Sequence, residues 1–130
     1  MRNLHAVPID TVPDLHGSGS VIVHGDFGPQ NVVVDGRRFA WLLDWEFARL
    51  GEPTEDLAWG EWIMRIHHRD HLEALPTFFE AADLHPSWPE RHDAMMQRCL
   101  WFLRRADAHG DLDASARWRQ RLRLTERWVE

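Results

Sequence analysis

The sequence has 130 residues, and because 44% of them are hydrophobic and 8 are tryptophan, intrinsic disorder is excluded. The formal net charge of -6 disfavours nucleic acid as a partner, and no apolar run approaches the roughly 20 residues of a membrane-spanning helix. The start "MRNLHAVPID" lacks the apolar region and cleavage site of a signal peptide, so we expect a cytoplasmic protein with no membrane partner.

The first half of the chain carries the strand signals. Residues 1–20 predict the end of a helix that Pro8 stops, followed by a linker that includes "GSGS" at 17–20. The β-branched runs in "SVIVH" and "NVVVD" predict two short strands. Asp35-Gly36 predicts a hairpin turn, with "RFAWLLD" as the returning strand. After Asp44 the sequence "WEFARLGEP" predicts a loop.

The second half is predicted to be helical. Thr54 is expected to cap a helix that ends near His68 and is apolar on most sides, so this helix is predicted to be buried. Pro76 is expected to kink or divide a second helix over residues 70–83. Strands followed by helices, without alternation, indicate an α+β fold in a single domain that spans residues 1–130.

Two more helices complete the predicted fold. Ser87 and Glu90 form the pattern of a capping box for a helix that ends at Gly110, and residues 112–128 predict the last helix. Cys99, the single cysteine, lies on an apolar helical stripe and cannot form an internal disulfide. We therefore expect Cys99 to be a core residue.

Polar side chains stand at the ends of the predicted strands. Asp26 and Asn31 flank the loop before the second strand, and the predicted hairpin returns Asp44 to the same end. Asn and Asp oxygens suit Mg²⁺, and a further carboxylate can accept the proton of a hydroxyl. Taken singly, each of these residues is better explained as a turn residue or the end of a strand. Their order and the Asp-x₄-Asn spacing instead favour the parts of a phosphoryl-transfer site.

Residues 21–58 resemble the catalytic core of the aminoglycoside phosphotransferase and choline kinase-like family. "HGDFGPQNVVVD" is similar to the family's HGD loop, "LLDWEFA" to its metal-binding segment, and "GEPTEDLA" to its turn into the next helix. "LHAVP" is similar to the end of the helix that precedes this core. The resemblance implies the C-terminal lobe of a protein kinase-like fold, with a helix stub and linker over 1–20, a catalytic core over 21–53 and a helical acceptor-binding part over 54–130.

The resemblance also implies a role for each matching residue. Asp26 resembles the catalytic base, and Asn31 and Asp44 resemble the ligands of Mg²⁺, with ATP as the co-substrate. His24 resembles a residue that braces the loop. Asp56 resembles a structural acid at the helix start, where capping and first-turn electrostatics explain it better than contact with a substrate.

The other half of a kinase fold has no counterpart in this sequence. All 15 basic residues are arginine, and "GSGS" before "VIVHGD" lacks the flanking hairpin of a phosphate-covering loop, so we expect the N-lobe to be missing and the nucleotide-binding residues to lie elsewhere. One hypothesis is a phosphotransferase that acts on a hydroxyl of a small molecule, for which the acidic composition favours a cationic acceptor. It would need an N-lobe supplied by upstream sequence or by a separate chain. A homo-oligomer is the other candidate assembly. The alternative is a non-catalytic binding module derived from such a lobe.

Two further clusters favour ordinary structural roles. His67 and His71 have the spacing of a metal-binding pair, but the sequence around them predicts a solvated helix end. The last helix is basic, and we expect its arginines to face solvent or to pair with acidic residues of the chain. These arginines are Arg117, Arg119, Arg121, Arg123 and Arg127.

Overall fold

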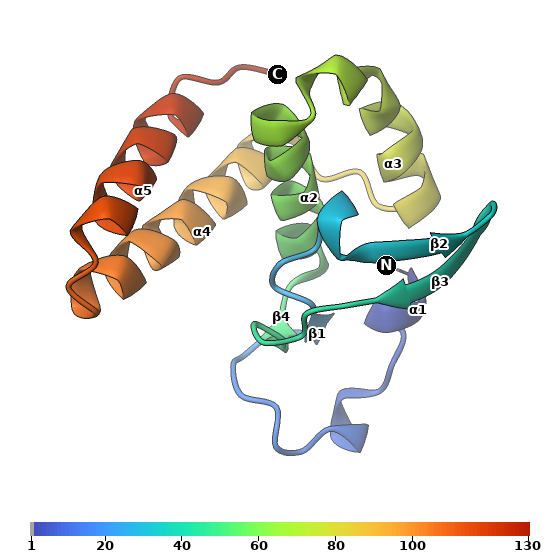
Figure 1. Ribbon diagram of the computed structural model, residues 1–130. Coiled ribbons are helices and arrows are strands. Elements are labelled where there is room, and N and C mark those ends of the chain that lie inside the picture. The colour runs from blue at the N-terminus through green and yellow to red at the C-terminus, as the bar shows by residue number, and fades with distance from the viewer. Residues whose placement is uncertain (1) are drawn as a thin grey trace. The chain divides into compact units, whose positions relative to one another are not determined.

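The computed structural model describes residues 2–130, which gather into two compact units. The first unit reaches to His85 and the second is Pro86–Glu130. Small antiparallel sheets and helices occur together, so the predicted α+β composition is confirmed (Figure 1). No helix in the described part of the chain combines the length and apolar character that a membrane crossing requires. The assignment of all 130 residues to one kinase-like domain stays a prediction.

The N-terminal segment of the first unit is largely exposed and is joined to Leu50 by backbone contacts. Helix α1 (Arg2–His5) and a 3₁₀ turn, η1 (Ile9–Thr11), are followed by the glycine-rich stretch, where Gly17 forms a parallel bridge with Leu50. The Leu50 N–H donates to the His16 carbonyl at 2.8 Å. Gly17 has φ of +105°, and a Cβ there would lie 2.6 Å from the Leu50 carbonyl oxygen. Glycine therefore permits close backbone packing against Leu50 at this position, and the assignment of residues 1–20 to a helix stub and linker stays a prediction.

The first small sheet pairs β1 (Val21–Val23) with β4 (Arg49–Gly51) in antiparallel register, Val21 opposite Gly51. All three β1 residues are buried. The predicted loop after Asp44 therefore contains a strand that the sequence did not reveal. Three residues are too few to show an alternating pattern, and β4 forms because its backbone groups find partners on both sides.

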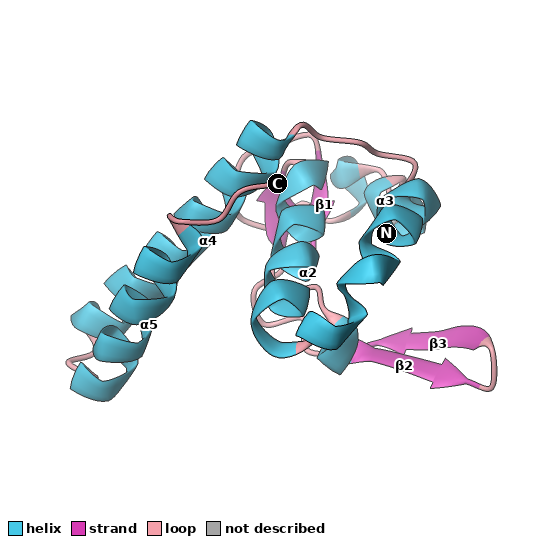
Figure 2. Cartoon of the chain, turned by 90° about the horizontal axis from the view of Figure 1, so that it is seen from above, coloured by secondary structure: helices cyan, strands magenta, loops and turns pink. Residues whose placement is uncertain are grey.

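The predicted hairpin is confirmed as β2 (Val32–Asp35) and β3 (Arg38–Leu42), preceded by the 3₁₀ turn η2 (Pro29–Asn31). The turn lies one residue later than predicted, because Asp35 pairs with Arg38 across it and Gly36 adopts φ of +60°. The ribbon extends away from the rest of its unit in both views (Figures 1 and 2).

Helix α2 (Pro53–His67) forms the centre of the first unit, and every residue from Asp56 to Met64 is buried. Its cap is Glu52, not the predicted Thr54, and the Glu52 N–H donates to Glu55 Oε1 at 2.8 Å. The difference has a steric cause. Pro53 has no N–H to satisfy and its fixed φ suits the first helical position, so the helix begins before Thr54.

The segment after α2 is divided as predicted. A 3₁₀ stretch, η3 (Arg69–Ala74), precedes α3 (Leu75–Ala82), and Pro76 lies in the first turn of α3. Proline is compatible with that turn but not with a continuous helix through it. Asp83 ends α3 in the left-handed conformation, with φ of +57°.

The second unit is a hairpin of two helices, α4 (Trp88–Ala108) and α5 (Leu112–Thr125), which lie side by side in Figures 1 and 2. The predicted capping box is present, since the Ser87 N–H and hydroxyl donate to Glu90 Oε2 at 2.7 and 2.6 Å. Cys99 is fully buried between the helices, 3.9 Å from Thr125 Oγ1, which confirms it as a core residue.

The basic face of α5 is partly used within its own unit. Arg119 Nη2 lies 2.8 Å from Asp107 Oδ1, and the guanidinium of Arg121 lies over the Trp118 ring at 4.6 Å. Partial burial on that ring lowers the pKa of Arg121. These contacts support the expectation of intramolecular pairing.

Candidate active site

The loop after β1 is held by a buried carboxylate on α2. Asp56, fully buried, accepts the His24 N–H at 2.8 Å and the Gly25 N–H at 2.9 Å. From α1, His5 Nε2 lies 3.4 Å from the same carboxylate. Gly25 has φ of +78°, and a Cβ there would lie 2.3 Å from the Phe47 carbonyl oxygen. Asp56 therefore fixes the loop backbone at a position that only glycine can occupy.

The His24 ring links this loop to the segment that follows β3. Its Nδ1 accepts the Asp26 N–H at 3.2 Å, so Nε2 carries the ring proton and donates to the Leu43 carbonyl at 2.8 Å. The ring is fully buried and meets Trp45 edge-on, with 4.7 Å between the ring centroids. Both ring nitrogens are engaged in holding the fold, as a bracing residue requires.

Asp26 and Asn31 are joined directly. Asn31 Nδ2 lies 2.8 Å from the Asp26 carbonyl oxygen and 3.1 Å from Asp26 Oδ2. The other carboxylate oxygen, Oδ1, accepts the indole N–H of Trp59 at 2.8 Å. Asp26 is half-buried. Its carboxylate is therefore held on two sides and still reaches the surface.

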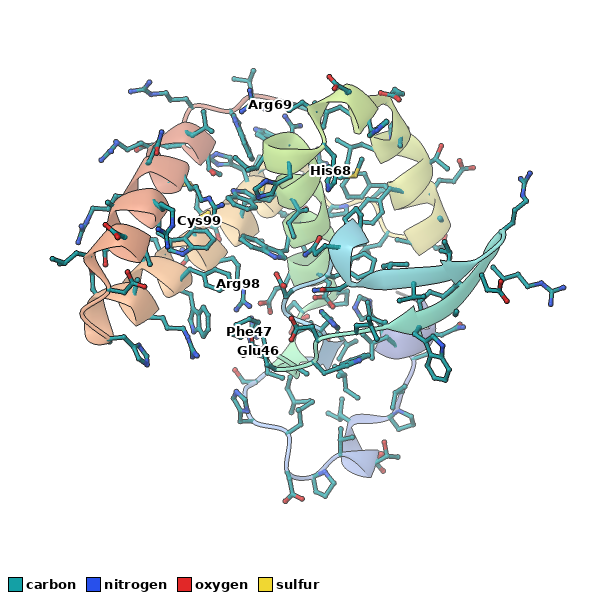
Figure 3. The ribbon with its side chains drawn as sticks, viewed as in Figure 1. Glu46, Phe47, His68, Arg69, Arg98 and Cys99 are labelled. Atoms are coloured by element: carbon teal, nitrogen blue, oxygen red, sulfur yellow. The ribbon has the colours of Figure 1, made fainter. Side chains whose placement is uncertain are left out.

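Asp44 is brought to the same end of the hairpin through the backbone. The Leu43 N–H donates to the Asn31 carbonyl at 2.8 Å, one step beyond the pairing of Val32 with Leu42, and Asp44 follows directly. Asp44 is exposed and has φ of +64°. A non-glycine residue in this region carries backbone strain of the kind that gathers at functional sites. Among residues 2–130, no hydrogen bond joins the Asp44 carboxylate to Asp26 or Asn31. The loop from Asp44 to β4 contains Glu46 and Phe47, labelled in Figure 3.

Comparison with known proteins assigns the chain to a family. The model of the phosphotransferase enzyme family matches residues 1–92. The chain belongs to this family. Viomycin phosphotransferase of Streptomyces vinaceus is 43% identical over 54 residues, which cover 38% of this chain and 18% of that protein. The chain therefore spans a small part of that relative's length. No solved structure matches the chain.

Membership of the phosphotransferase family confirms the resemblance drawn from the sequence motifs. The family match covers the whole hydrogen-bonded set of His24, Asp26, Asn31 and Asp56, together with Asp44. The roles of these residues stay predictions, because the match assigns no role to any single position.

The predicted site has oxygen ligands of the kind that Mg²⁺ prefers. Because Asn31 Nδ2 donates to Asp26, Oδ1 is the side-chain atom of Asn31 that can bind a cation, and the exposed Asp44 carboxylate is a hard anionic donor. Within residues 2–130, no three His, Cys, Asp or Glu side chains gather closely enough to hold a metal. Two protein ligands suit Mg²⁺, which keeps waters and binds substrate phosphates.

The histidines near the end of α2 lie apart from this site in the sequence. His67 packs edge-on against Trp62, with 6.3 Å between ring centroids, and the exposed His71 lies 3.9 Å from Glu73. His68 follows the last residue of α2, and Figure 3 labels it with Arg69.

Sequence analysis missed Trp59. Its indole contacts the predicted base. In the sequence, however, a tryptophan within a helix that is apolar on most sides indicates only a packed core residue. A usable signal was its position three residues after Asp56, since residues at i and i+3 share a helix face. A residue one turn beyond the carboxylate that holds the loop faces the loop as well.

Proposed function

We propose that the chain carries the catalytic and acceptor-binding half of an ATP-dependent phosphotransferase that acts on a hydroxyl of a small molecule. The observation that supports it most directly is the bonded pair of Asp26 and Asn31 on a buried, braced loop. Asp44 follows at the same end of the hairpin. Family membership supplies the reaction class, and this geometry supplies a carboxylate that is oriented yet accessible.

The proposed step needs one proton acceptor from this chain. The acceptor hydroxyl donates its proton to the Asp26 carboxylate while its oxygen forms a bond to the γ-phosphorus of ATP. The bond between that phosphorus and the β,γ-bridging oxygen breaks, and ADP leaves with the bond's electron pair. The half-buried Asp26 positions the hydroxyl, and the Trp59 and Asn31 contacts keep the carboxylate directed at it.

Asn31 and Asp44 would hold the Mg²⁺ that accompanies ATP in this proposal. A bound Mg²⁺ neutralises phosphate charge and orients the transferred group. Asn31 is held by its own contacts to Asp26, whereas Asp44 is positioned by backbone conformation alone. We expect weak binding by the chain itself, because nucleotide phosphates normally supply further ligands.

The hydrogen bonds of the His24 ring are evidence against a metal-dependent phosphohydrolase at the same loop. Metal binding by its ring would require a free nitrogen, and both nitrogens are engaged in hydrogen bonds inside the fold. Releasing either one would break a contact that braces the loop, either with the Asp26 N–H or with the Leu43 carbonyl.

The phosphate-binding part of the reaction must come from elsewhere. The 15 basic residues are all arginine, so the lysine that holds ATP phosphates in the kinase template has no counterpart here. We propose that a lobe from upstream sequence or from another chain supplies it. The acidic composition favours a cationic acceptor, and the similarity to viomycin phosphotransferase makes viomycin one candidate to test.

The test is consumption of ATP in the presence of viomycin, aminoglycosides, choline and amino-alcohols. It compares the chain alone with the chain extended upstream or mixed with a candidate N-lobe. We expect turnover only when the lobe is present, because catalysis here consists mostly of positioning and charge stabilisation. Asp26→Asn should lower that turnover by about 10²- to 10⁴-fold, the usual range for losing a general base.

Asp35→Asn is the matched control, because Asp35 is exposed at the hairpin turn, and it should leave turnover unchanged. Turnover that survives Asp26→Asn would refute the assignment of the base. Turnover by the chain alone that depends on Asp26 would refute the need for a second lobe, and an arginine would then have to hold the phosphates. No turnover with the lobe present would favour a non-catalytic binding module.

A further inference from the structure

The indole of Trp59 makes a contact that the family match and the sequence motifs do not assign. Its Nε1–H donates to Asp26 Oδ1 at 2.8 Å across 33 positions of sequence. Trp59 is only 3% exposed. Its ring is stacked on Trp62, with centroids 4.4 Å apart and an angle of 6° between the planes. Trp62 is itself 1% exposed, so the stacked pair is fixed inside the first unit.

This contact decides how freely the Asp26 carboxylate can turn. An indole has one N–H and no acceptor, and a hydrogen bond from it to a carboxylate is charge-assisted. The second carboxylate oxygen is held by Asn31, which belongs to a different element, η2, and whose Nδ2 lies 3.1 Å away. Two donors on opposite oxygens, one on a buried helix and one beside the hairpin, fix both the position and the plane of the carboxylate.

We propose that Trp59 is a positioning residue for Asp26, and that its indole N–H holds the carboxylate in a single rotamer. The importance of this for turnover rests on the proposed function, in which Asp26 accepts the proton of the acceptor hydroxyl. The Trp59 side chain is too deeply buried to meet an acceptor. It acts on the reaction through Asp26, as a supporting residue of a preorganised site does.

The first test is NMR on the full 130-residue chain and does not depend on turnover. The three-bond couplings between Hα and the two Hβ protons of Asp26 report whether its χ1 is fixed or averaged. We expect the values of one staggered rotamer in the native chain and averaged values in Trp59→Phe, which keeps a stacked ring but has no N–H. Trp62→Phe makes the same change in the other member of the stacked pair and should keep the fixed values.

Two results of this test would overturn the proposal. One is an unchanged, fixed set of Asp26 couplings in a folded Trp59→Phe chain. The other is equal averaging in Trp59→Phe and Trp62→Phe, since the effect would then come from packing and not from the N–H.

A second measurement covers the case in which Trp59→Phe does not fold. In Asp26→Ala the native indole loses its acceptor, so its Nε1–H resonance should move upfield and exchange faster with solvent. Asp35→Ala should leave that resonance in place. An Nε1–H resonance of Trp59 whose position and exchange rate do not change in Asp26→Ala would refute the contact. If these signals respond as expected but no acceptor is phosphorylated in an Asp26-dependent reaction, the proposed function fails and the positioning contact stands.

Discussion

Replacing Asp56 with alanine tests whether one buried carboxylate holds the HGD loop. Asp56 accepts the backbone N–H groups of His24 and Gly25 at 2.8 and 2.9 Å, and none of its surface is exposed. Asp56→Ala leaves both donors buried without an acceptor. Each orphaned donor costs about 1–3 kcal/mol, so the free energy of unfolding should fall by roughly 2–6 kcal/mol. The lower half of that range is expected, because the mutation also removes the cost of burying a charge.

The loss should be large compared with the stability of the protein. Small domains have unfolding free energies of about 5–15 kcal/mol, so Asp56→Ala would remove a substantial fraction. Urea denaturation measures the total loss in the free energy of unfolding. Amide hydrogen exchange at His24 and Gly25 measures the local effect without assuming that both compact units unfold together.

Asp70→Ala is the matched control, since Asp70 is exposed on η3 in the same unit, and it should change stability by less than about 0.5 kcal/mol. Similar results for Asp56→Ala and Asp70→Ala, in both stability and exchange at His24 and Gly25, would refute the bracing role.

Two further predictions concern backbone packing and acid stability. Gly17→Ala should lower the free energy of unfolding by more than about 2 kcal/mol in urea denaturation, because a Cβ would meet the Leu50 carbonyl at 2.6 Å in addition to the cost of positive φ. Gly36 has φ of +60° and open space around it, so Gly36→Ala should lower the free energy of unfolding by only about 1–2 kcal/mol. Equal losses would contradict close packing at Gly17. The Ser87 hydroxyl lowers the pKa of Glu90, so the capping box stabilises α4 above the unfolded pKa of Glu90 and this contribution is lost as the pH falls through its folded pKa. Ser87→Ala should therefore destabilise α4 near neutral pH and have a smaller effect at a pH below the folded pKa of Glu90, as followed by amide exchange, and a pH-independent loss would disprove the linkage.

The sequence predicted those parts of the fold that rest on local signals. The hairpin follows from β-branched runs around a glycine turn, and the capping box at Ser87 follows from two side chains three residues apart. The proximity of Asp26 and Asn31 was anticipated in the same way, because a short loop keeps them close, whereas their hydrogen bond was not. The position of Asp44 at the same end was predicted from the hairpin alone, because a hairpin returns the chain to where it began.

The features that the sequence did not reveal depend on contacts between distant segments. The strand β4 has three residues and exists through pairing with β1 and the contact with Gly17. The choice of Glu52 over Thr54 as the cap reflects the fit of Pro53 in the first helical turn. The contact from Trp59 to Asp26 spans 33 positions and becomes visible only when α2 is packed against the loop.

The measurement that tests the central claim most directly on this chain is a Mg²⁺ titration followed by NMR. In the proposed function turnover needs a second lobe, whereas the expected weak binding of Mg²⁺ can be followed on the chain itself. The claim is that Asn31 and Asp44 form one cation site beside Asp26. We predict that added Mg²⁺ shifts the signals of Asn31 and Asp44 first, and that Asp44→Asn weakens the response whereas Asp35→Asn does not. Shifts that map to His67 and His71, or that are unaffected by Asp44→Asn, would contradict the account.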